Sequence, residues 1–215
     1  MSNKEKKVRK PEDSDSGFRF VRAIVNPLYK FWYNPKVIGA ENIPDDGAII
    51  VAGNHMHIMD QCNVFLATKR PIHYMAKKEY FDGKFAFFFK LAGCISVDRG
   101  RNDMNCLRSA LNVLKRDGSI GIFPEGTRNK TEKFLLPFKT GTAFLAKKSG
   151  AKIVPFGVAG DYKFRSRNLR IVIGKPFDPK EMELEEITKK LRDEIGRLMI
   201  EAAENNHPKA KSLGA

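Results

Sequence analysis

The sequence is poor in the features that mark several common protein classes. It has 3 cysteines, Cys62, Cys94 and Cys106, an odd number without C-x-x-C spacing. We therefore expect reduced, buried thiols and neither a disulfide framework nor a metal site. No segment free of Asp, Glu, Lys and Arg reaches the ~18–20 apolar residues of a membrane-spanning helix. The mean hydropathy of -0.40 agrees with this.

The N-terminal segment lacks a secretory signal. Residues 1–17 contain no apolar core and no small-residue cleavage site. We expect a polar tail at 1–17, a second tail at 207–215 and a cytoplasmic protein.

Acidic residues are scarce relative to basic ones. The chain has 25 Asp and Glu against 39 Lys and Arg, which gives a formal net charge of +14. Such a balance indicates an anionic partner: nucleic acid, anionic lipid headgroups, a phosphorylated substrate or an acidic carrier protein. Neither a K/R-G-F-G-F-V type strand nor a zinc-ligand spacing is present, which argues against nucleic acid.

Short apolar segments rich in β-branched residues alternate with segments of helical periodicity. Strands are predicted at 48–53, 72–76, 94–97, 119–123, 153–158 and 169–173, with a short extra strand at 37–39. Helices are predicted at 103–116, 138–149 and 181–204. This alternation predicts an α/β fold, with a mixed, largely parallel sheet flanked by helices, in one domain over 36–206.

In two of the predicted helices, apolar residues recur at helical spacing and form one face. Residues 103–116 place Met104, Leu107, Leu111 and Leu114 on one side, with Asn102 or Asp103 as the cap. Residues 181–204 carry Leu184, Ile187, Leu191, Ile195, Leu198 and Ala202 at helical spacing. We expect both faces to pack on the core.

Residues 18–35 predict an N-terminal amphipathic helix. Its apolar positions are Phe18, Val21, Val25, Leu28 and Trp32, and Pro27 is expected to kink or restart it. Flanking basic residues and the Trp32-Tyr33 pair are typical of a helix that lies on a membrane. A first helix packed on the core is the alternative.

A histidine and an aspartate follow the first strong strand. His55 lies at the expected strand end, and Asp60 lies five residues later at the start of a predicted helix. A carboxylate that bonds one imidazole nitrogen raises the basicity of the other, which can then take a proton from an alcohol. The same spacing also occurs by chance in unrelated proteins.

The sequence offers no covalent nucleophile beside this pair. It contains no G-x-S-x-G segment, and Cys62 is expected inside a helix. A His–Asp pair alone is suited to direct transfer, in which a deprotonated hydroxyl attacks a thioester.

Three further segments follow predicted strands or lie within them. Phe123–Arg128 reads F-P-E-G-T-R, in which Pro124 and Gly126 favour a tight turn and Arg128 can bind phosphate. Gly93–Arg99 ends in the adjacent charges Asp98 and Arg99, with Arg101 close by. A proline inside the segment Ile153–Val158, Pro155, indicates an edge, a bulge or a strand start. Taken singly, a surface turn or salt bridges explain the first two.

Together, these segments resemble the four motifs of the glycerolipid acyltransferase family, which includes the bacterial 1-acyl-sn-glycerol-3-phosphate (lysophosphatidic acid) acyltransferases. Asn54–Asp60 resembles N-H-x-x-x-x-D, and Gly93–Arg99 resembles G-x-I-x-x-D-R. Phe123–Arg128 matches F-P-E-G-T-R without a mismatch, and Val154-Pro155 resembles the V-P segment. The resemblance covers about residues 36–175.

The resemblance implies a role for each matching residue. It makes His55 the general base and Asp60 its orienting partner. It places Arg99, Glu125, Gly126, Thr127 and Arg128 in the acceptor and phosphate site, Lys77 near the thioester or phosphate, and Asn54, Gly93, Pro124 and Pro155 around the pocket.

Two positions depart from the family's pattern, and one aromatic run stands outside it. His57 occupies the position of a serine, and we expect it to point away from His55 as a bystander. Gly157 replaces a larger apolar residue. Phe81, Phe85, Phe87, Phe88 and Phe89 form either an acyl-chain wall, a membrane-dipping surface or ordinary core.

The function implied is acyl transfer from an acyl thioester to the sn-2 hydroxyl of lysophosphatidic acid at the inner face of the cell membrane. No bound cofactor or metal is implied, and acyl carrier protein or coenzyme A carries the acyl group. Alternatives are a related enzyme with another lysophospholipid or glycerol phosphate acceptor, or a non-catalytic basic protein that binds lipid or nucleic acid. The oligomeric state is left open.

Overall fold

A computed structural model of the chain describes residues 15–84, 86–98 and 103–204. Arg99, Arg101, Asn102, Phe85 and the predicted tail at 207–215 lie outside the described residues, as does most of the tail at 1–17. Among the described residues, no helix combines the length and the apolar character needed to cross a bilayer.

Helices and strands alternate along the chain, as the sequence predicts. The strands are β1 (Lys36–Ile38), β2 (Ile49–Gly53), β3 (His73–Lys77), β4 (Ile95–Val97), β5 (Ser119–Ile122), β6 (Lys152–Ala159) and β7 (Arg170–Ile173). The helices are α1 (Asp15–Tyr33), α2 (Asp60–Ala67), α3 (Ala86–Leu91), α4 (Met104–Leu114), α5 (Gly141–Ser149) and α6 (Leu184–Glu204). Two short 3-10 turns, η2 (Ala40–Asn42) and η3 (Lys78–Phe81), join them.

The strands form one mixed sheet in the order β1-β7-β6-β2-β5-β3-β4. Neighbouring strands are parallel except for the antiparallel pair β6 and β7. The largely parallel α/β sheet is therefore confirmed. Because β2, β3, β5 and β6 run in the same direction, their carboxyl ends meet at one edge of the sheet, where ligand sites of such sheets form.

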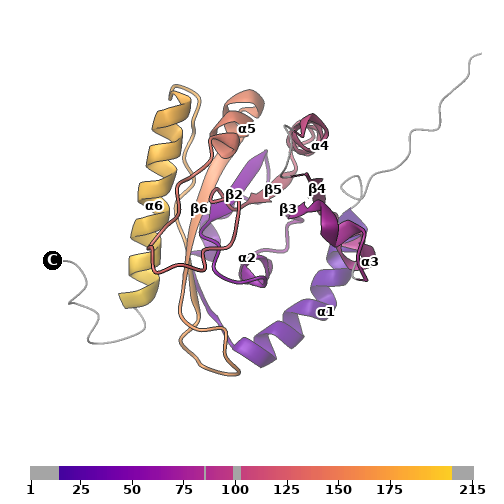
Figure 1. Cartoon of the computed structure of the whole chain (residues 1–215), viewed down its shortest axis with the longest axis vertical. Coiled ribbons are helices and arrows are strands. Elements are labelled where there is room, and N and C mark those ends of the chain that lie inside the picture. Colours follow the sequence, from indigo (N-terminus) through magenta and orange to yellow (C-terminus); the bar gives the residue numbers. More distant parts are fainter. Residues whose placement is uncertain (1–14, 85, 99–102, 205–215) are drawn as a thin grey trace, which may run out of the picture.

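Helices cover both faces of this sheet (Figure 1). Alternate residues of β2 show the division, because Ile49 and Val51 pack with α1 and α2, whereas Ile50 and Ala52 pack with α4, α5 and α6. Strands that are buried on both faces have continuous apolar sequences, and this is why their positions could be predicted from the sequence.

Two predicted helix faces are tested by the structure. On α4 the buried residues are Cys106, Ser109, Ala110, Val113 and Leu114. The side chain of Met104 is 64% exposed, so its predicted place in the core is wrong. Asp103 caps α4 as predicted, accepting hydrogen bonds from the backbone nitrogens of Asn105 (3.1 Å) and Cys106 (3.0 Å). The predicted face of α6 is confirmed for its buried residues from Ile187 to Ala202.

Helix α1 buries a different face from the one predicted. Phe18, Val21 and Tyr29 are buried and Val25 is partly buried, but Leu28 (64%) and Trp32 (51%) are exposed. The predicted grouping of Leu28 and Trp32 with Phe18 is therefore wrong. The helix continues through the exposed Pro27 and does not restart there.

The opposite side of α1 carries apolar residues that remain largely exposed. Phe20, Ile24, Leu28, Phe31 and Trp32 recur at helical spacing, and each is between 48% and 64% exposed. We call this set the outer face of α1. A contiguous apolar stripe of this kind on a small protein marks an interaction surface.

Strand β6 tolerates Pro155 for a reason that the sequence left open. Its paired partners are β2 and β7, so it is an interior strand and not an edge. Pro155 lies between the β6–β7 ladder, which begins at Phe156–Ile173, and the isolated bridge Ile153–Phe177. Its missing N–H therefore falls in a gap of the ladder.

Gly157 on β6 lies against helix α6. A Cβ atom at this position would lie 2.4 Å from the backbone nitrogen of Met199 and 2.5 Å from the carbonyl carbon of Leu198, both in α6. The glycine therefore allows α6 to approach the sheet closely.

We expect Gly157→Ala to lower the free energy of unfolding by about 1–3 kcal/mol, because backbone atoms cannot move aside as a flexible side chain can. Gly141→Ala is the matched control, since nothing lies within 4 Å of its added Cβ. Urea unfolding of both variants tests this. Equal stability of the two variants would contradict the close approach of α6.

Candidate active site

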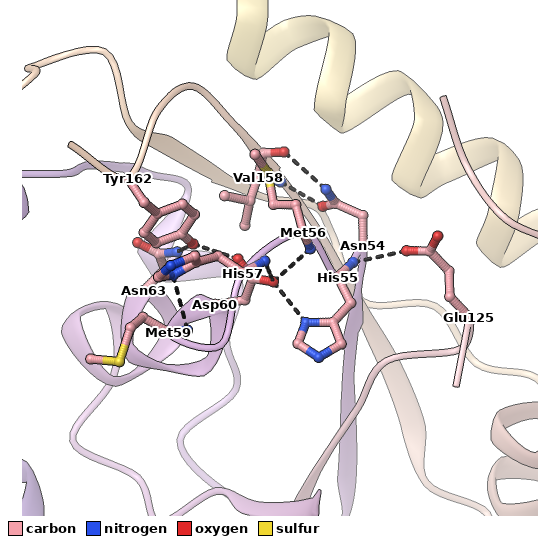
Figure 2. A network of polar contacts seen from close by, with 10 residues as sticks. All are labelled: Asn54, His55, Met56, His57, Met59, Asp60, Asn63, Glu125, Val158 and Tyr162. Atoms are coloured by element: carbon pink, nitrogen blue, oxygen red, sulfur yellow. Dashed lines mark hydrogen bonds and ion pairs between the residues drawn. The ribbon is translucent and has the colours of Figure 1, made fainter. Parts of the chain in front are cut away.

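The carboxylate of Asp60 lies at the centre of a network of polar contacts (Figure 2). Asp60 is the first residue of α2, and its side chain is wholly buried. Its Oδ2 atom accepts hydrogen bonds from His55 Nδ1 (2.7 Å) and from the backbone nitrogens of Met56 and His57 (both 2.8 Å). The backbone thus folds back around the carboxylate, and the predicted His55–Asp60 contact is formed.

His55 is oriented by this contact and by an aromatic ring. Its imidazole stacks on Phe123 with ring centroids 4.0 Å apart, and its side chain is 13% exposed. Because Nδ1–H donates its hydrogen bond to Asp60, the neutral ring has its lone pair on Nε2. Figure 2 shows Nε2 pointing away from Asp60. The pair can therefore act as a proton acceptor.

The second oxygen of Asp60 is bonded by a residue that the sequence analysis missed. Tyr162, in the loop after β6, donates its hydroxyl hydrogen to Asp60 Oδ1 (2.5 Å). Asn63 Nδ2 donates to the Tyr162 hydroxyl (2.7 Å), and the Tyr29 hydroxyl donates to Asn63 Oδ1 (2.8 Å). The only sequence signal for Tyr162 was its position just beyond the carboxyl end of a strand next to β2.

The two tyrosines of this network stay protonated. Burial raises the pKa of Tyr162 well above its usual value, and the nearby charge of Asp60 adds to the effect. Burial likewise raises the pKa of Tyr29. Both hydroxyls are therefore hydrogen-bond donors throughout the neutral range.

The strand end that carries His55 is held by its neighbours. Asn54 bonds both backbone groups of Val158, through Nδ2 to the carbonyl (3.0 Å) and through Oδ1 from the amide (2.8 Å). This contact extends the β2–β6 pairing by one side chain. Asn54 therefore holds the strand end that carries His55. It does not line the cavity described below, and its predicted part in shaping the pocket stays a prediction.

The F-P-E-G-T-R loop holds His55 from the other side. Glu125 is buried, and its Oε1 accepts a hydrogen bond from the His55 backbone nitrogen (2.8 Å). Its Oε2 accepts one from the Leu136 backbone nitrogen (2.9 Å), and the Asn129 backbone nitrogen donates to the His55 carbonyl (2.7 Å). Both carboxylate oxygens of Glu125 are thus taken by backbone amides, and its predicted contact with the acceptor stays a prediction.

The tight turn expected in this loop is present. Gly126 has φ +70°, and its backbone nitrogen donates to the Phe123 carbonyl (2.9 Å). The Lys139 backbone nitrogen donates to the carbonyl of the buried Pro124 (2.9 Å). The turn directs the following residues, Thr127 and Arg128, to the cavity described next.

A cavity of about 650 Å³ opens beside His55. It contains three further predicted site residues, Lys77 at the end of β3 and the loop residues Thr127 and Arg128. Its apolar lining includes Phe65, Tyr74, Phe88, Phe89, Ala92 and Phe123. Lys77 forms an ion pair with Glu79 (2.6 Å), whereas Arg128 pairs with no carboxylate among the described residues.

Not every predicted site residue reaches this cavity. Gly93 has φ +68° and lies just after α3, and its carbonyl accepts a hydrogen bond from His73 (2.8 Å). Pro155 is buried in β6 and contacts Gly174. Neither lines the cavity, although Ala92 and Cys94 beside Gly93 do. Arg99 lies outside the described residues.

His57 lies apart from the cavity. Its ring stacks on Tyr162 with centroids 4.2 Å apart, and Figure 2 shows the rings of His55 and His57 on opposite sides of Asp60. Burial lowers the pKa of His57, which favours the neutral ring. This arrangement agrees with the expected bystander, whose role stays a prediction.

The cysteines nearest to the site are not activated. Cys62 and Cys94 line the cavity, and burial raises the pKa of each thiol to about 12. A thiol in this state is a poor nucleophile at neutral pH. Among the described residues, no group of three or more His, Cys, Asp or Glu side chains is arranged to hold a metal ion.

The structure thus combines an α/β sheet with a His–Asp pair at its carboxyl edge, beside an apolar cavity that basic residues also line. A family model described as "Acyltransferase" matches residues 34–159. The chain belongs to this acyltransferase family, as the motifs indicated.

Two bacterial proteins of known name are similar to this chain in sequence. The chain is 30% identical over 148 residues to the 1-acyl-sn-glycerol-3-phosphate acyltransferase of Bacillus subtilis, covering 66% of this chain and 73% of that protein. It is 32% identical over 136 residues to the protein of that name from Borreliella burgdorferi, covering 62% of this chain and 54% of the relative.

A solved structure has the same fold. It is the crystal structure of the 1-acyl-sn-glycerophosphate (LPA) acyltransferase from Thermotoga maritima, with a TM-score of 0.71 and 26% sequence identity. The match covers 86% of this chain and 78% of that one.

We expect Glu125→Gln to lower the free energy of unfolding by about 1–3 kcal/mol, because the amide NH₂ would face a backbone N–H and leave both donors unpaired. Glu132→Gln, an exposed change in the same loop, is the control. Thermal unfolding measures the effect. A variant of unchanged stability with a raised KM for the acceptor would instead place Glu125 in acceptor binding.

Proposed function

We propose that this acyltransferase moves a fatty acyl group from an acyl thioester to the sn-2 hydroxyl of lysophosphatidic acid, which gives phosphatidic acid. The observation that carries the proposal is the His55–Asp60 pair beside a cavity that is apolar in most of its lining and contains Lys77 and Arg128. The names of the similar proteins from three bacteria support the choice of acceptor.

His55 acts as the general base in this reaction. Its Nε2 takes the proton of the acceptor hydroxyl as the oxygen attacks the thioester carbonyl, and Asp60 stabilises the imidazolium that forms. The tetrahedral intermediate collapses, the C–S bond breaks, and the imidazolium returns the proton to the leaving thiolate. General-base help of this kind contributes about 10²–10⁴ in rate.

Arg128 binds the phosphate of the acceptor. Its guanidinium has no carboxylate partner among the described residues, and guanidinium groups bind phosphate through paired hydrogen bonds. Lys77 is the weaker candidate for binding the phosphate, because its ion pair with Glu79 already neutralises part of its charge. Arg99 is proposed to join Arg128, on the motif alone.

The apolar part of the cavity holds an acyl chain. Phe88 and Phe89 of α3 line it together with buried side chains of α2 and β3, which supports the acyl-wall interpretation for these two phenylalanines. Phe87, by contrast, is 75% exposed and points to solvent. Acyl carrier protein or coenzyme A delivers the chain, and both thioesters suit the net charge of +14.

The enzyme acts as a peripheral protein on the inner face of the cell membrane. The outer face of α1 supplies apolar side chains, and Arg19 and Lys30 on the same helix are exposed cations. A basic helix with such a face lies in the headgroup region of an anionic bilayer. This position gives the cavity access to a lipid acceptor.

His55→Ala is expected to lower the rate of phosphatidic acid formation by at least about 10²-fold, because the proton acceptor is lost. The assay uses lysophosphatidic acid on anionic vesicles with each long-chain acyl thioester in turn. His57→Phe, which keeps a ring against Tyr162, should lose less than about tenfold. Wild-type protein without activity on either thioester would refute the proposed acceptor.

The double variant Leu28→Ser/Phe31→Ser is expected to bind anionic vesicles at least about tenfold more weakly, since burying one such side chain contributes about 1.5–3 kcal/mol. Met104→Ser is the matched control, because Met104 is equally exposed but lies on α4 across the sheet. Sedimentation with phosphatidylglycerol vesicles measures both. Equal binding of the two variants would remove α1 from the membrane contact.

A further inference from the structure

Residues 160–168, which lie in the loop between β6 and β7, contact the candidate active site on one side. Tyr162 bonds Asp60 Oδ1, the carboxylate oxygen that His55 does not use. Its ring also stacks on His57 and lies edge-on to Tyr33 of α1, with centroids 5.5 Å apart. Tyr162 is therefore fixed by contacts from two helices and the loop before α2.

The same loop contacts the outer face of α1 on its other side. Phe164 packs edge-on against Trp32 (4.9 Å between centroids) and Phe31 (6.2 Å). The Arg165 backbone nitrogen donates to the Trp32 carbonyl (2.7 Å). Phe31, Trp32 and Phe164, which we call the aromatic tip, nevertheless stay 51–60% exposed.

The surroundings of the aromatic tip are basic. Lys30, Lys163, Arg165 and Arg167 are all exposed, and the Arg165 guanidinium lies 5.8 Å from the centre of the Phe31 ring. The one acidic residue of the loop, Asp161, accepts a hydrogen bond from Asn168 Nδ2 (2.9 Å) and forms a long ion pair with Lys163 (3.9 Å). Aromatic rings among cations match the surface of an anionic bilayer, where aromatic residues and Lys or Arg are both favoured.

Hydrogen bonds within the loop connect its two ends. The Asp161 backbone nitrogen donates to Asn168 Oδ1 (3.0 Å), and Ser166 Oγ donates to the Asp161 carbonyl (2.9 Å). Gly160 has φ +103°, and a Cβ there would lie 2.1 Å from the Asn168 carbonyl oxygen. The segment that carries both Tyr162 and Phe164 is therefore closed by contacts between its two ends.

A second connection runs through α1 itself. Tyr29, one turn before the aromatic tip, bonds Asn63 of α2, and Asn63 bonds Tyr162. Arg22 and Asn26 of α1 donate to the carbonyl of Phe65 in α2, each at 2.9 Å. Helix α1 is thus hydrogen-bonded to the helix that begins with Asp60.

We propose that loop 160–168 couples an anionic lipid surface to the His55–Asp60 pair, with the aromatic tip in contact with the lipid and Tyr162 as a positioning residue for Asp60. The proposal rests on the proposed function in taking His55 as the base. Lipid contact stabilises the packing of Phe164 on α1, and the population with Tyr162 bonded to Asp60 rises with it.

Tyr162 acts through Asp60 and not on the substrate. Without its hydroxyl, Oδ1 has no bonding partner among the described residues, and the carboxylate can rotate away from the geometry that orients His55. This loss affects the proton transfer step and leaves substrate binding in place. It therefore predicts a lower kcat with an unchanged KM.

The first experiment uses Trp32, which is the single tryptophan of the chain. Its fluorescence should shift to shorter wavelength with phosphatidylglycerol vesicles but not with phosphatidylcholine vesicles. Phe164→Ala should weaken vesicle binding measured by this shift about tenfold. Phe144→Ala, an exposed aromatic change on α5, should not change it. A wild-type protein without a shift would overturn the proposal.

The second experiment measures coupling. Tyr162→Phe should fold and keep the fluorescence shift, with a lower melting temperature because Asp60 Oδ1 and Asn63 Nδ2 lose their partner. It should lose about 10- to 100-fold in kcat at unchanged KM. Tyr33→Phe is the matched control, because its hydroxyl bonds no described residue while its ring keeps the same contacts. Unchanged kcat in Tyr162→Phe would overturn the role of Tyr162.

The third experiment compares two forms of the acceptor. Wild-type protein should turn over lysophosphatidic acid faster on phosphatidylglycerol vesicles than a short-chain acceptor dispersed as monomers, and Phe164→Ala should lose only the vesicle rate. Loss of both rates alike would overturn the coupling. A wild-type protein that shows the Trp32 shift but no product would refute the proposed acceptor and leave the lipid contact of the tip supported.

Discussion

The arrangement of the site depends on the buried carboxylate of Asp60. Asp60 is wholly buried, and an ionised carboxylate away from water is stable only when hydrogen bonds replace its hydration. Four donors do so here, two from backbone amides, one from His55 and one from Tyr162. The loop before α2, the start of α2 and the loop after β6 must therefore all be in place before the His55 ring has a fixed orientation.

The backbone groups of His55 are also held by hydrogen bonds. A strand end has free N–H and C=O groups, and a mobile strand end would carry a mobile imidazole. Here the amide of His55 is bonded by Glu125 of the F-P-E-G-T-R loop, its carbonyl is bonded by Asn129 just after that loop, and the preceding Asn54 is bonded to β6. The loop thus has a structural role in this chain, because it holds the residue that faces the cavity.

The sheet and the His–Asp pair could both be predicted from the sequence, because each follows from a local pattern. Strands buried on both faces must be continuous apolar runs, and side chains after parallel strands must share one edge, so local patterns determined both. Sequence reasoning did not reach Tyr162 or Tyr29, because their roles depend on contacts between segments more than thirty residues apart. No local period encodes such a contact.

The same limit explains the errors on the helices. The apolar residues of α1 occupy two sides of the helix, and a pattern of apolar positions cannot tell the side that packs on α2 from the side that remains exposed. Met104 on α4 was misplaced for a related reason, since small residues such as Ala110 and Cys106 fill the contact with the sheet. Packing against a sheet favours small side chains where the helix lies close.

The stacking of His55 on Phe123, with Nδ1 occupied by Asp60, leaves the ring one working nitrogen. In the proposed reaction, that nitrogen both removes the proton from the alcohol and delivers it to the departing sulfur. The two substrates must therefore be present together, each with its reacting atom close to the same point. Such an enzyme forms a ternary complex, and its initial-rate plots intersect where those of a double-displacement enzyme would run parallel.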